Sequence, residues 1–318
     1  ATAIADGFDF RSVLVKTREG RPIKVENNKD ASTLGDGNAR VHASVLSMYD
    51  INRLQGPKVD GKDIVWADFY SQLGAKLKAM AVSEKPIVLL TQTFASPTTQ
   101  IIIEKFIAQY PNVSHVVYDA LSSSQALDAF ENVYGVRALA DYDFSKAETI
   151  VSIGADILGD WQGGGYDCGY AKSRVPKKLS GKSKMSYHIQ FESNMTLSGA
   201  NADNRISTDP ANQKKIIARI YAQLTGESYS TDLSPEYKKA VDQVVARLKK
   251  SKSKAVLVSG IEDLAAQEVV LAINEYLESE VIDITQPKLI RQASNEAVDQ
   301  LIDDMQNGKV KGLITAGV

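Results

Sequence analysis

The chain has 318 residues, of which 43% are hydrophobic and 24% charged, and its formal net charge is −2. These values are typical of soluble globular proteins, and the length predicts two or three domains or one large α/β unit. The near-neutral charge argues against non-specific nucleic-acid binding and against an electrostatic membrane anchor. No apolar run reaches the roughly 18–20 residues that a helix needs to span a bilayer, so no direct membrane span is expected.

The cysteine and histidine content excludes several kinds of site. Cys168 is the single cysteine, so the chain cannot form an intrachain disulfide or hold an iron–sulfur cluster, which takes about four thiolates. The three histidines, His42, His115 and His188, are scattered along the chain, which excludes zinc sites with standard ligand spacings. We expect solvated or core positions for the histidines and no metal ligands.

The N-terminal part predicts a small β-rich module over 1–57. Residues 12–17 and 22–26 flank a turn that contains Gly20, a pattern typical of a β-hairpin. A helix is expected over 39–49, where apolar residues recur at helical spacing.

The rest of the chain alternates short apolar runs with helical patterns, which is typical of βαβ units with a parallel sheet. The expected strands cover 86–90, 114–118, 149–153, 255–258, 281–284 and 313–315. The expected helices cover 67–81, 97–110, 124–134, 212–224, 235–250, 263–278 and 294–306.

Two stretches have matching layouts, Asp143–Gly154 and Met305–Gly317, each with a polar lead-in, an apolar strand and a glycine. The sequence therefore predicts two βαβαβ units that superpose as pseudo-repeats, with Gly154 and Gly317 at equivalent strand ends. The predicted fold class is α/β, with domain divisions 1–57, 58–205 and 206–318. Ala1 in place of Met suggests a trimmed start. The end at Val318, just past an expected strand, leads us to expect a fragment of a longer protein.

The region 159–205 shows little regular periodicity, which predicts a functional loop or an interface. Its glycine-rich loop, Gly159–Gly165, follows a strand but does not open a helix at once, which weakens a dinucleotide-binding reading. The alternative is a loop shaped for close packing against another chain or domain. Because aromatic residues lie among the glycines, we expect the region either to be mobile or to leave aromatic surface exposed in the isolated chain. These residues are Trp161, Tyr166, Tyr170, Tyr187 and Phe191.

Two groups of polar residues are candidates for chemistry. Ser122–Ser124 could supply a nucleophile, but no G-x-S-x-G elbow or suitably spaced histidine accompanies it. Ser124 is better explained as the N-cap of the following helix. Glu192 and Asp203 share their region with Lys172, Arg174 and Arg205. One interpretation is that Glu192 or Asp203 is a catalytic acid. The preferred interpretation is that both form ion pairs at the surface or at an interface.

Four segments resemble motifs of molybdopterin oxidoreductases. Gly20–Asn28 resembles their G-R-P-x-K-x-E-G-N hairpin, and Tyr49–Pro57 their L-Y-x-P-x-R-L-x-x-P segment. Ile64–Phe69 is similar to their I-S-W-D-E-A helix start, and Gly308–Val318 to their G-K-V-x-x-L-x-x-x-G-x-N-P strand, cut before the Asn-Pro.

Three further segments, Asp160–Asp167, Lys184–Glu192 and Thr196–Asp203, resemble the large iron–sulfur subunit of bacterial alternative complex III. That family belongs to a quinol:electron-acceptor oxidoreductase. The resemblance runs along essentially the whole chain.

The departures from the family pattern concern the cofactors. Gly37–Arg40 stands where cluster-bearing members have C-x-[RK]-G, and Pro210–Gln213 stands near the P-G-T-D that grips the guanine of the pterin dinucleotide. Leu121–Ser124 stands where the molybdenum ligand usually lies. Serine ligates molybdenum in some relatives, so this last difference is not decisive.

The resemblance therefore implies a scaffold domain with no catalytic residues, no metal ligands and no cofactor of its own. Gly154, Asp156, Ser122 and Pro210 are then vestigial positions of a pterin site. The parent would be a respiratory, quinol-oxidising complex, with iron–sulfur clusters in a C-terminal part outside this chain. The domain would lie on the periplasmic side and contact other subunits of that membrane complex.

Two alternatives remain open at this point. One is a catalytic molybdopterin subunit of the polysulfide or thiosulfate reductase kind, which the serines at 122–124 and the double α/β layout favour. The other is a free-standing small-ligand binding module with a cleft between its α/β halves.

Overall fold

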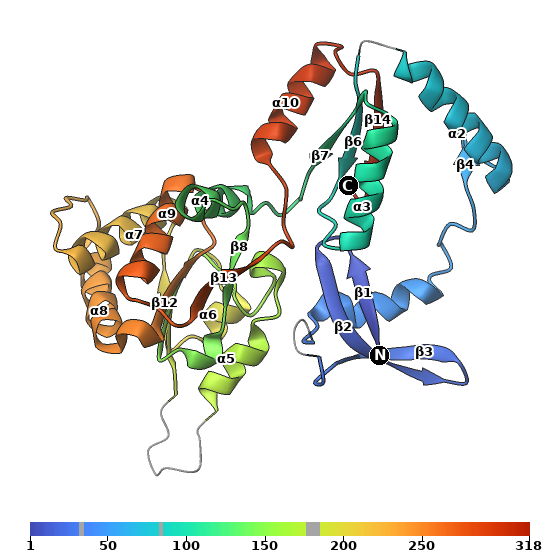
Figure 1. Cartoon of the computed structure of the whole chain (residues 1–318). Helices are drawn as coiled ribbons and strands as arrows, with labels where there is room; N and C mark the ends of the chain where they lie inside the picture. The colour runs from blue at the N-terminus through green and yellow to red at the C-terminus, as the bar shows by residue number, and fades with distance from the viewer. Residues whose placement is uncertain (32–34, 83–84, 176–184) are drawn as a thin grey trace. The chain divides into compact units, whose positions relative to one another are not determined.

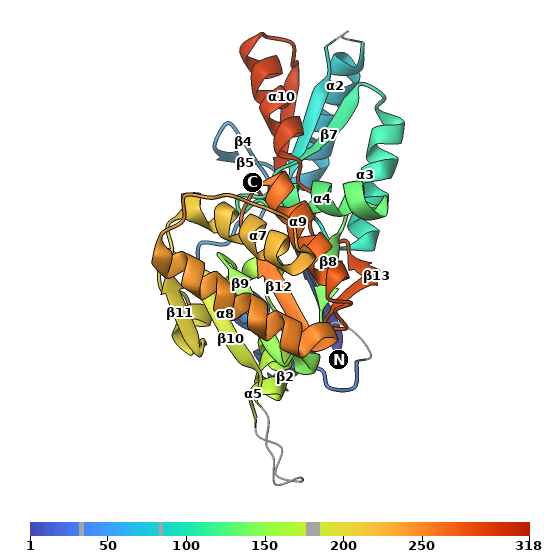
Figure 2. The same cartoon turned by 90° about the vertical axis from the view of Figure 1, so that its left-hand side faces the viewer.

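The computed structural model describes residues 1–31, 35–82, 85–175 and 185–318, which form two compact units (Figures 1 and 2). Unit 1 comprises Ala1–Ser122 with Gln292–Val318, and unit 2 comprises Ser123–Arg291. Each unit is built around its own parallel sheet, which confirms the predicted α/β fold class with its β-rich N-terminal module. Each of the two compact units contains one whole parallel sheet. The domain boundaries predicted from the sequence lie elsewhere, after residues 57 and 205.

Unit 1 begins with an antiparallel sheet in the order β1-β2-β3. Its strands are β1 (Thr2–Asp6), β2 (Asp9–Arg18) and β3 (Arg21–Asn27). Glu19 and Gly20 turn the chain between β2 and β3 with φ values of 50° and 79°, as a tight two-residue hairpin turn requires. The predicted hairpin is confirmed, and β1 was not predicted.

The predicted helix over 39–49 is two elements, α1 (Ala39–Ala43) and the 3-10 helix η1 (Ser44–Tyr49). Asn38 caps α1, because its side-chain oxygen accepts from the backbone N–H of Val41 at 2.9 Å. Val13, Val25 and Val41 form the small core between the sheet and this segment. A short hairpin follows, made of β4 (Lys58–Val59) and β5 (Lys62–Asp63).

The α/β part of unit 1 comes from two separate stretches of sequence. The first stretch holds α2 (Trp66–Ala81), β6 (Ile87–Thr91), α3 (Pro97–Gln109) and β7 (Val113–Val117). The second holds α10 (Asn295–Gln306) and β14 (Gly312–Ala316). The strands form one parallel sheet in the order β14-β6-β7. Unit 1 therefore has a βαβαβ layout, and unit 2 is inserted in sequence between its second and third strands.

Unit 2 has a four-stranded parallel sheet in the order β11-β10-β9-β12 and a two-stranded antiparallel pair, β13-β8. Its strands are β8 (Leu139–Tyr142), β9 (Thr149–Ile153), β10 (Tyr187–Glu192), β11 (Asn204–Ser207), β12 (Ala255–Ser259) and β13 (Ile282–Lys288). Its α-helices are α4 (Ser124–Tyr134), α5 (Asp167–Arg174), α6 (Leu197–Asn201), α7 (Pro210–Thr225), α8 (Pro235–Ser251) and α9 (Leu264–Tyr276). Its 3-10 helices are η2 (Phe144–Lys146), η3 (Trp161–Gly163) and η4 (Lys252–Lys254).

Three long helices begin with the same local signal, a capping residue followed by proline. Ser96, Asp209 and Ser234 accept from the backbone N–H three residues on, and proline stands at the first helical position of α3, α7 and α8. The fixed φ of proline suits the start of a helix, where its missing N–H costs nothing.

The core of unit 2 lies on both faces of its sheet. On one face, α7 and α8 lie over the strands (Figure 2). Their buried aliphatic side chains pack on the sheet. These include Ile216, Ile220, Val241, Val244 and Leu248, each at 0% exposure. Each such side chain contributes about 1.5–3 kcal/mol of hydrophobic free energy on burial. The other face packs on α4 and on an aromatic cluster that includes Phe130, Tyr142 and Phe144.

The predicted pseudo-repeat is wrong in its strand pairing. β9 pairs with β10 and β12 in unit 2, not with β7, and β14 pairs with β6. β13, at the predicted strand 281–284, pairs antiparallel with β8. Matching strand lengths and gaps describe only local structure. Parallel pairing joins segments far apart in sequence, so the pattern could not identify the partners.

Candidate functional site

The carboxyl edge of the unit 2 sheet is where an open α/β sheet of this kind would bind a ligand. From β9 the chain continues to β10 and then β11, which lie on one side of β9 in the sheet. The next strand, β12, pairs with the other side of β9, so the strand order reverses between β9 and β12. Gly154 and Gly260 follow these two strands. Their amides donate back into the sheet, to Phe191 O at 2.8 Å and to Ile153 O at 2.9 Å.

The two glycine backbones lie in contact at this edge. A Cβ added to Gly260 would lie 2.2 Å from the carbonyl oxygen of Gly154. A Cβ added to Gly154, where φ is 69°, would lie 2.8 Å from Oε1 of Gln213 in the first turn of α7. Close packing against the backbone therefore requires glycine at 260, and the positive φ favours glycine at 154.

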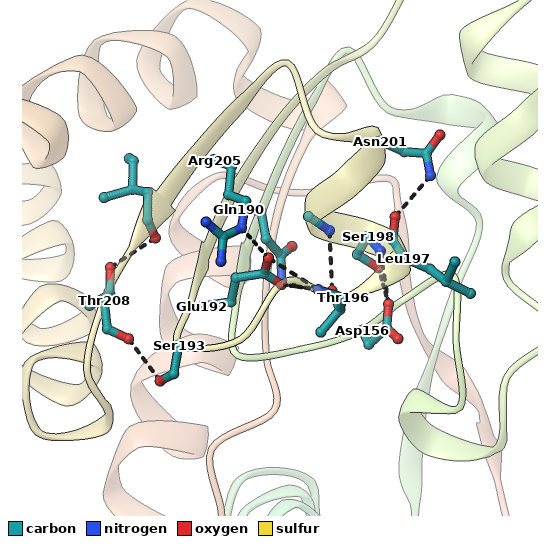
Figure 3. A network of polar contacts seen from close by, with 12 residues as sticks. Asp156, Gln190, Glu192, Ser193, Thr196, Leu197, Ser198, Asn201, Arg205 and Thr208 are labelled. Atoms are coloured by element: carbon teal, nitrogen blue, oxygen red, sulfur yellow. Dashed lines mark hydrogen bonds and ion pairs between the residues drawn. The ribbon is translucent and has the colours of Figure 1, made fainter.

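Asp156, two residues after Gly154, is bound to the start of α6 (Figure 3). Its Oδ1 accepts from the backbone N–H of Ser198 at 2.9 Å and from the Ser198 hydroxyl at 2.7 Å. Oγ of Ser198 in turn accepts from the N–H of Leu158 at 3.0 Å. The carboxylate thus ties the loop after β9 to α6.

Glu192, the last residue of β10, is the second carboxylate of this network (Figure 3). The Thr196 hydroxyl donates to its Oε2 at 2.6 Å, and Arg205 Nε lies 2.5 Å from its Oε1. The residue is only 2% exposed. Burial alone would raise the pKa of Glu192, but the hydrogen bonds from Thr196 and Arg205 outweigh it and hold that pKa below its usual value.

A buried polar row continues along the same face of β10. His188 and Gln190 are both 0% exposed. The Gln190 amide donates to Ala155 O at 3.1 Å and lies 3.3 Å from Oε2 of Glu192. Gln190 Oε1 lies 3.1 Å from Nε2 of His188, and His188 Nδ1 lies 3.2 Å from the Tyr170 hydroxyl. Burial lowers the pKa of His188 to about 4, so its ring is neutral at neutral pH.

The neutral ring fits this chain of contacts with one tautomer. Because the Gln190 nitrogen already donates to Ala155, its oxygen faces His188 and accepts from an Nε2–H. Nδ1 then carries no proton and faces the Tyr170 hydroxyl, whose single proton also has Asn201 O as an acceptor at 3.1 Å. At the other end of β10, Arg174 binds Asp203 at 2.5 Å, and Asp203 accepts from the N–H of His188 at 2.8 Å.

The preferred interpretation of Glu192 and Asp203 as ion-paired residues agrees with these contacts, with one correction. Glu192 is in the interior of unit 2, not at its surface, because β10 is a central strand of the sheet. Lys172 is exposed on α5. His188 and Gln190 were not identified from the sequence, although the alternation of apolar and polar residues in Tyr187–Glu192 is a strand signal.

The other two predicted vestigial positions of a pterin site, Pro210 and Ser122, lie in different units. Pro210 begins α7 next to its cap Asp209 in unit 2. Ser122 belongs to unit 1, where its hydroxyl donates to Asn295 Oδ1 at 2.9 Å. The predicted cap Ser124 is instead the first residue of α4, and its hydroxyl donates to Asp128 at 3.2 Å.

Of the two predicted alternatives for 159–205, exposed aromatic surface is wrong for the described residues. Tyr166, Tyr170 and Phe191 are 3%, 6% and 0% exposed. Trp161 donates its indole N–H to Ser259 O at 3.1 Å and packs against Tyr142 and Tyr166. These rings complete the core of unit 2 and leave little aromatic surface for a partner. Residues 176–184, in the basic loop, lie outside the described part of the chain.

The residues at the carboxyl edge do not fit a pterin dinucleotide. Its phosphates need N–H and O–H donors without uncompensated carboxylates nearby. Here the donors of Thr196 and Ser198 already bind Glu192 and Asp156, and both glycine amides bind within the sheet. Pro210–Gln213 forms the first turn of α7 and supplies no carboxylate for a guanine.

The stretch that corresponds to a cluster ligand in the family, Gly37–Arg40, also has another structural role. Asn38 caps α1 and donates to Asp9 Oδ1 at 2.7 Å, and Arg40 Nε binds Asp9 Oδ2 at 2.7 Å. Within residues 1–31, 35–82, 85–175 and 185–318, no group of three or more His, Cys, Asp and Glu side chains is arranged to hold a metal ion. No helix among these residues is both long and apolar enough to cross a membrane.

Comparisons with known proteins bear on the fold. No protein-family model matches the chain, and no curated protein matches it. Acetylene hydratase from Pelobacter acetylenicus is similar in structure, with a TM-score of 0.54, 11% identity, and coverage of 93% of this chain and 46% of that one. The formyltransferase/hydrolase complex (FhcABCD) from Methylorubrum extorquens, in complex with methylofuran, gives a TM-score of 0.47, 13% identity, and coverage of 82% and 60%.

The chain spans less than two thirds of the length of either structure. At 11% identity this likeness concerns the fold alone, and the chain shares an α/β fold with parallel sheets with acetylene hydratase.

Proposed function

We propose that the chain is a cofactor-free, molybdopterin-oxidoreductase-like scaffold domain in the large subunit of a quinol-oxidising respiratory complex of the alternative complex III kind. One observation supports it most. The side chains of Asp156 and Glu192 bind the donor groups that an anionic cofactor would need at the carboxyl edge of the unit 2 sheet. The ligand-binding edge of the fold is thus converted into an internal support for α6 and β11.

The remaining parts of the proposal follow from the resemblance of Asp160–Asp167, Lys184–Glu192 and Thr196–Asp203 to that subunit. Iron–sulfur clusters elsewhere in the parent subunit transfer the electrons. The domain lies on the periplasmic side and binds other subunits of the membrane complex. Its own contribution is assembly and no chemistry.

Assembly and catalysis can be separated in the native host. The full-length gene product is tagged and purified from membranes in mild detergent, as wild type and as Gly199→Ala, which disturbs the Glu192 site. We expect quinol-oxidising activity to co-purify with partner subunits. The variant should yield less assembled complex, with an unchanged turnover number for each intact complex.

Either of two results would contradict the scaffold. The first is a variant complex that assembles in normal amount but turns over more slowly. The second is a protein that purifies without partners and reduces polysulfide or thiosulfate by itself, which would favour the catalytic alternative.

A further inference from the structure

A cavity of about 210 Å³ lies in unit 2, where the C-terminal ends of α4 and α9 meet β13. Tyr134 is the last residue of α4, Glu275 lies in the last turn of α9, and Ile282 and Ile284 belong to β13. Tyr134 and Ile282 also pack on the aromatic cluster of the unit 2 core, so the fold fixes this part of the wall. The remaining lining residues are Asn274, Glu278 and Ser279.

The lining of the cavity combines an apolar part with an acidic part. Tyr134, Ile282 and Ile284 form the apolar part, whereas Glu275 and Glu278 are exposed to solvent. In the described chain, neither carboxylate accepts a hydrogen bond or forms an ion pair, and no lysine or arginine lines the cavity. Burial raises the pKa of the Tyr134 hydroxyl, and the nearby charge of Glu275 raises it further. The negative charge in this cavity is therefore uncompensated.

The two glutamates lie where they do not favour the helix. The C-terminal end of a helix carries a negative partial charge that favours basic residues, yet the last turn of α9 contains none. Glu278 follows the helix with a φ of 53°, a position that glycine usually takes. Its N–H donates to Glu275 O at 2.9 Å, and that of Ser279 donates to Asn274 O at 3.0 Å, as in the usual glycine-terminated helix end. Departures from such local rules are typical of functional sites.

We propose that this cavity binds an alkylammonium group, a primary amine on an aliphatic stem. An ammonium group has three donors and no acceptor, and the two carboxylates with the Tyr134 hydroxyl oxygen supply three acceptors. The aromatic ring of Tyr134 also attracts a cation. Ile282 and Ile284 pack against the stem. The ends of α4 and α9 add negative partial charge, which disfavours an anion of the same length.

Methyl-resolved NMR of the 318-residue chain, with labelled isoleucine δ1 methyl groups, tests the proposal at the site itself. We expect n-butylammonium chloride to shift the signals of Ile282 and Ile284 and to saturate in the millimolar range, because so small a ligand binds weakly. Neither n-butanol nor sodium chloride at the same concentrations should produce a saturable shift. An absence of saturable shifts with n-butylammonium in that range, or equal shifts with n-butanol, overturns the proposal.

Charge-removing variants test the acidic part of the lining. Glu275→Gln and Glu278→Gln keep the shape of the side chain, and each should weaken n-butylammonium binding by about fivefold, the upper end for one exposed ion pair. Glu236→Gln is the matched control, because Glu236 is exposed in the first turn of α8 and does not line the cavity. This control should bind as wild type does. Equal affinities in all three variants overturn the proposal.

Glu278→Gly separates binding from folding. Glycine removes the charge and suits the positive φ, so this variant should bind about fivefold more weakly and yet unfold at a higher urea concentration. Wild-type affinity in this variant overturns the role of Glu278 in binding.

A second probe distinguishes a free amine from the lysine side chain of a partner protein, since both carry the same group. The probe is Nα-acetyl-lysine N-methylamide, which presents the ammonium stem on a peptide backbone. Tighter binding than that of n-butylammonium supports the site with a partner lysine as its occupant. Weaker binding supports the site with a free amine as its occupant. Failure of both probes to bind overturns the proposal.

Discussion

Glu192 lies so close to Gly199 that a side chain at residue 199 has no room. A Cβ at Gly199 would lie 1.8 Å from Oε1 of Glu192. Thr196 joins the two, because its hydroxyl donates to Glu192 at 2.6 Å and accepts from the N–H of Gly199 at 3.1 Å. The first turn of α6 is therefore held directly against the carboxylate that ends β10.

Gly199→Ala should destabilise unit 2 by about 3 kcal/mol, because the new methyl group displaces the buried Glu192 carboxylate from its partners. The change is measured by urea denaturation followed through Trp161. A Trp66→Phe background leaves Trp161 as the single tryptophan, so that its fluorescence reports on unit 2 alone.

Gly169→Ala is the control within the same unit. Gly169 lies in α5, and the nearest atom to its added Cβ is 3.5 Å away, an ordinary contact. Alanine should leave stability unchanged or raise it by up to about 1 kcal/mol, since glycine is unfavourable within a helix. Equal losses in the two variants would contradict the close fit of Glu192 and Gly199.

Glu192→Gln should lower the free energy of unfolding of unit 2 by about 2 kcal/mol, because it leaves Arg205 without its ion pair. The cost stays below that of a fully buried pair, since the Arg205 side chain is 25% exposed. A double-mutant cycle with Arg205→Met measures the coupling. Asp232→Asn, which breaks the exposed pair with Lys215, should have no measurable effect. A zero coupling between Glu192 and Arg205 would show that the pair contributes nothing.

His188 should make unit 2 less stable in mild acid. Its ordinary pKa of 6.5 applies in the unfolded chain, whereas burial lowers the pKa in the folded chain to about 4. Between these values the unfolded state binds more protons, so the free energy of unfolding falls as pH is lowered through this window, by about 3 kcal/mol in all. Below pH 4 the contribution of His188 stays constant.

The matched variant is His188→Gln, which cannot titrate. Glu192 and Asp203 contribute their own losses when pH falls through their folded pKa values, which lie below the usual range. The difference between wild type and variant isolates the histidine, and urea midpoints from pH 4 to pH 7 measure it. Parallel curves for the two proteins would show that His188 does not titrate on unfolding.

The local elements were largely predictable from the sequence, and their partners were not. Pro97, Pro210 and Pro235 follow capping residues, and apolar periodicity continues from them, so the helices could be placed within a few residues. β10 was missed because its polar positions suggested a loop. They are instead buried and bound to one another along one face of the strand.

The candidate site depends on contacts between distant residues. Asp156 and Ser198 are 42 positions apart, and Glu192 and Arg205 are 13 apart. The sequence identified Gly154 and Asp156 as positions at a sheet edge, because an apolar strand precedes them. It could not show that Asp156 accepts from Ser198, since parallel pairing of β9, β10 and β11 brings these segments together.

Molybdenum and pterin content measures most directly whether the domain is a cofactor-free scaffold. The intact parent protein is purified from its native host grown with molybdate. Metals are then counted by inductively coupled plasma mass spectrometry, and oxidised pterin by fluorescence. We expect neither molybdenum nor pterin above background, because Asp156 and Glu192 bind the donors that the cofactor would need. One molybdenum per chain together with pterin would contradict the scaffold and favour a molybdopterin enzyme.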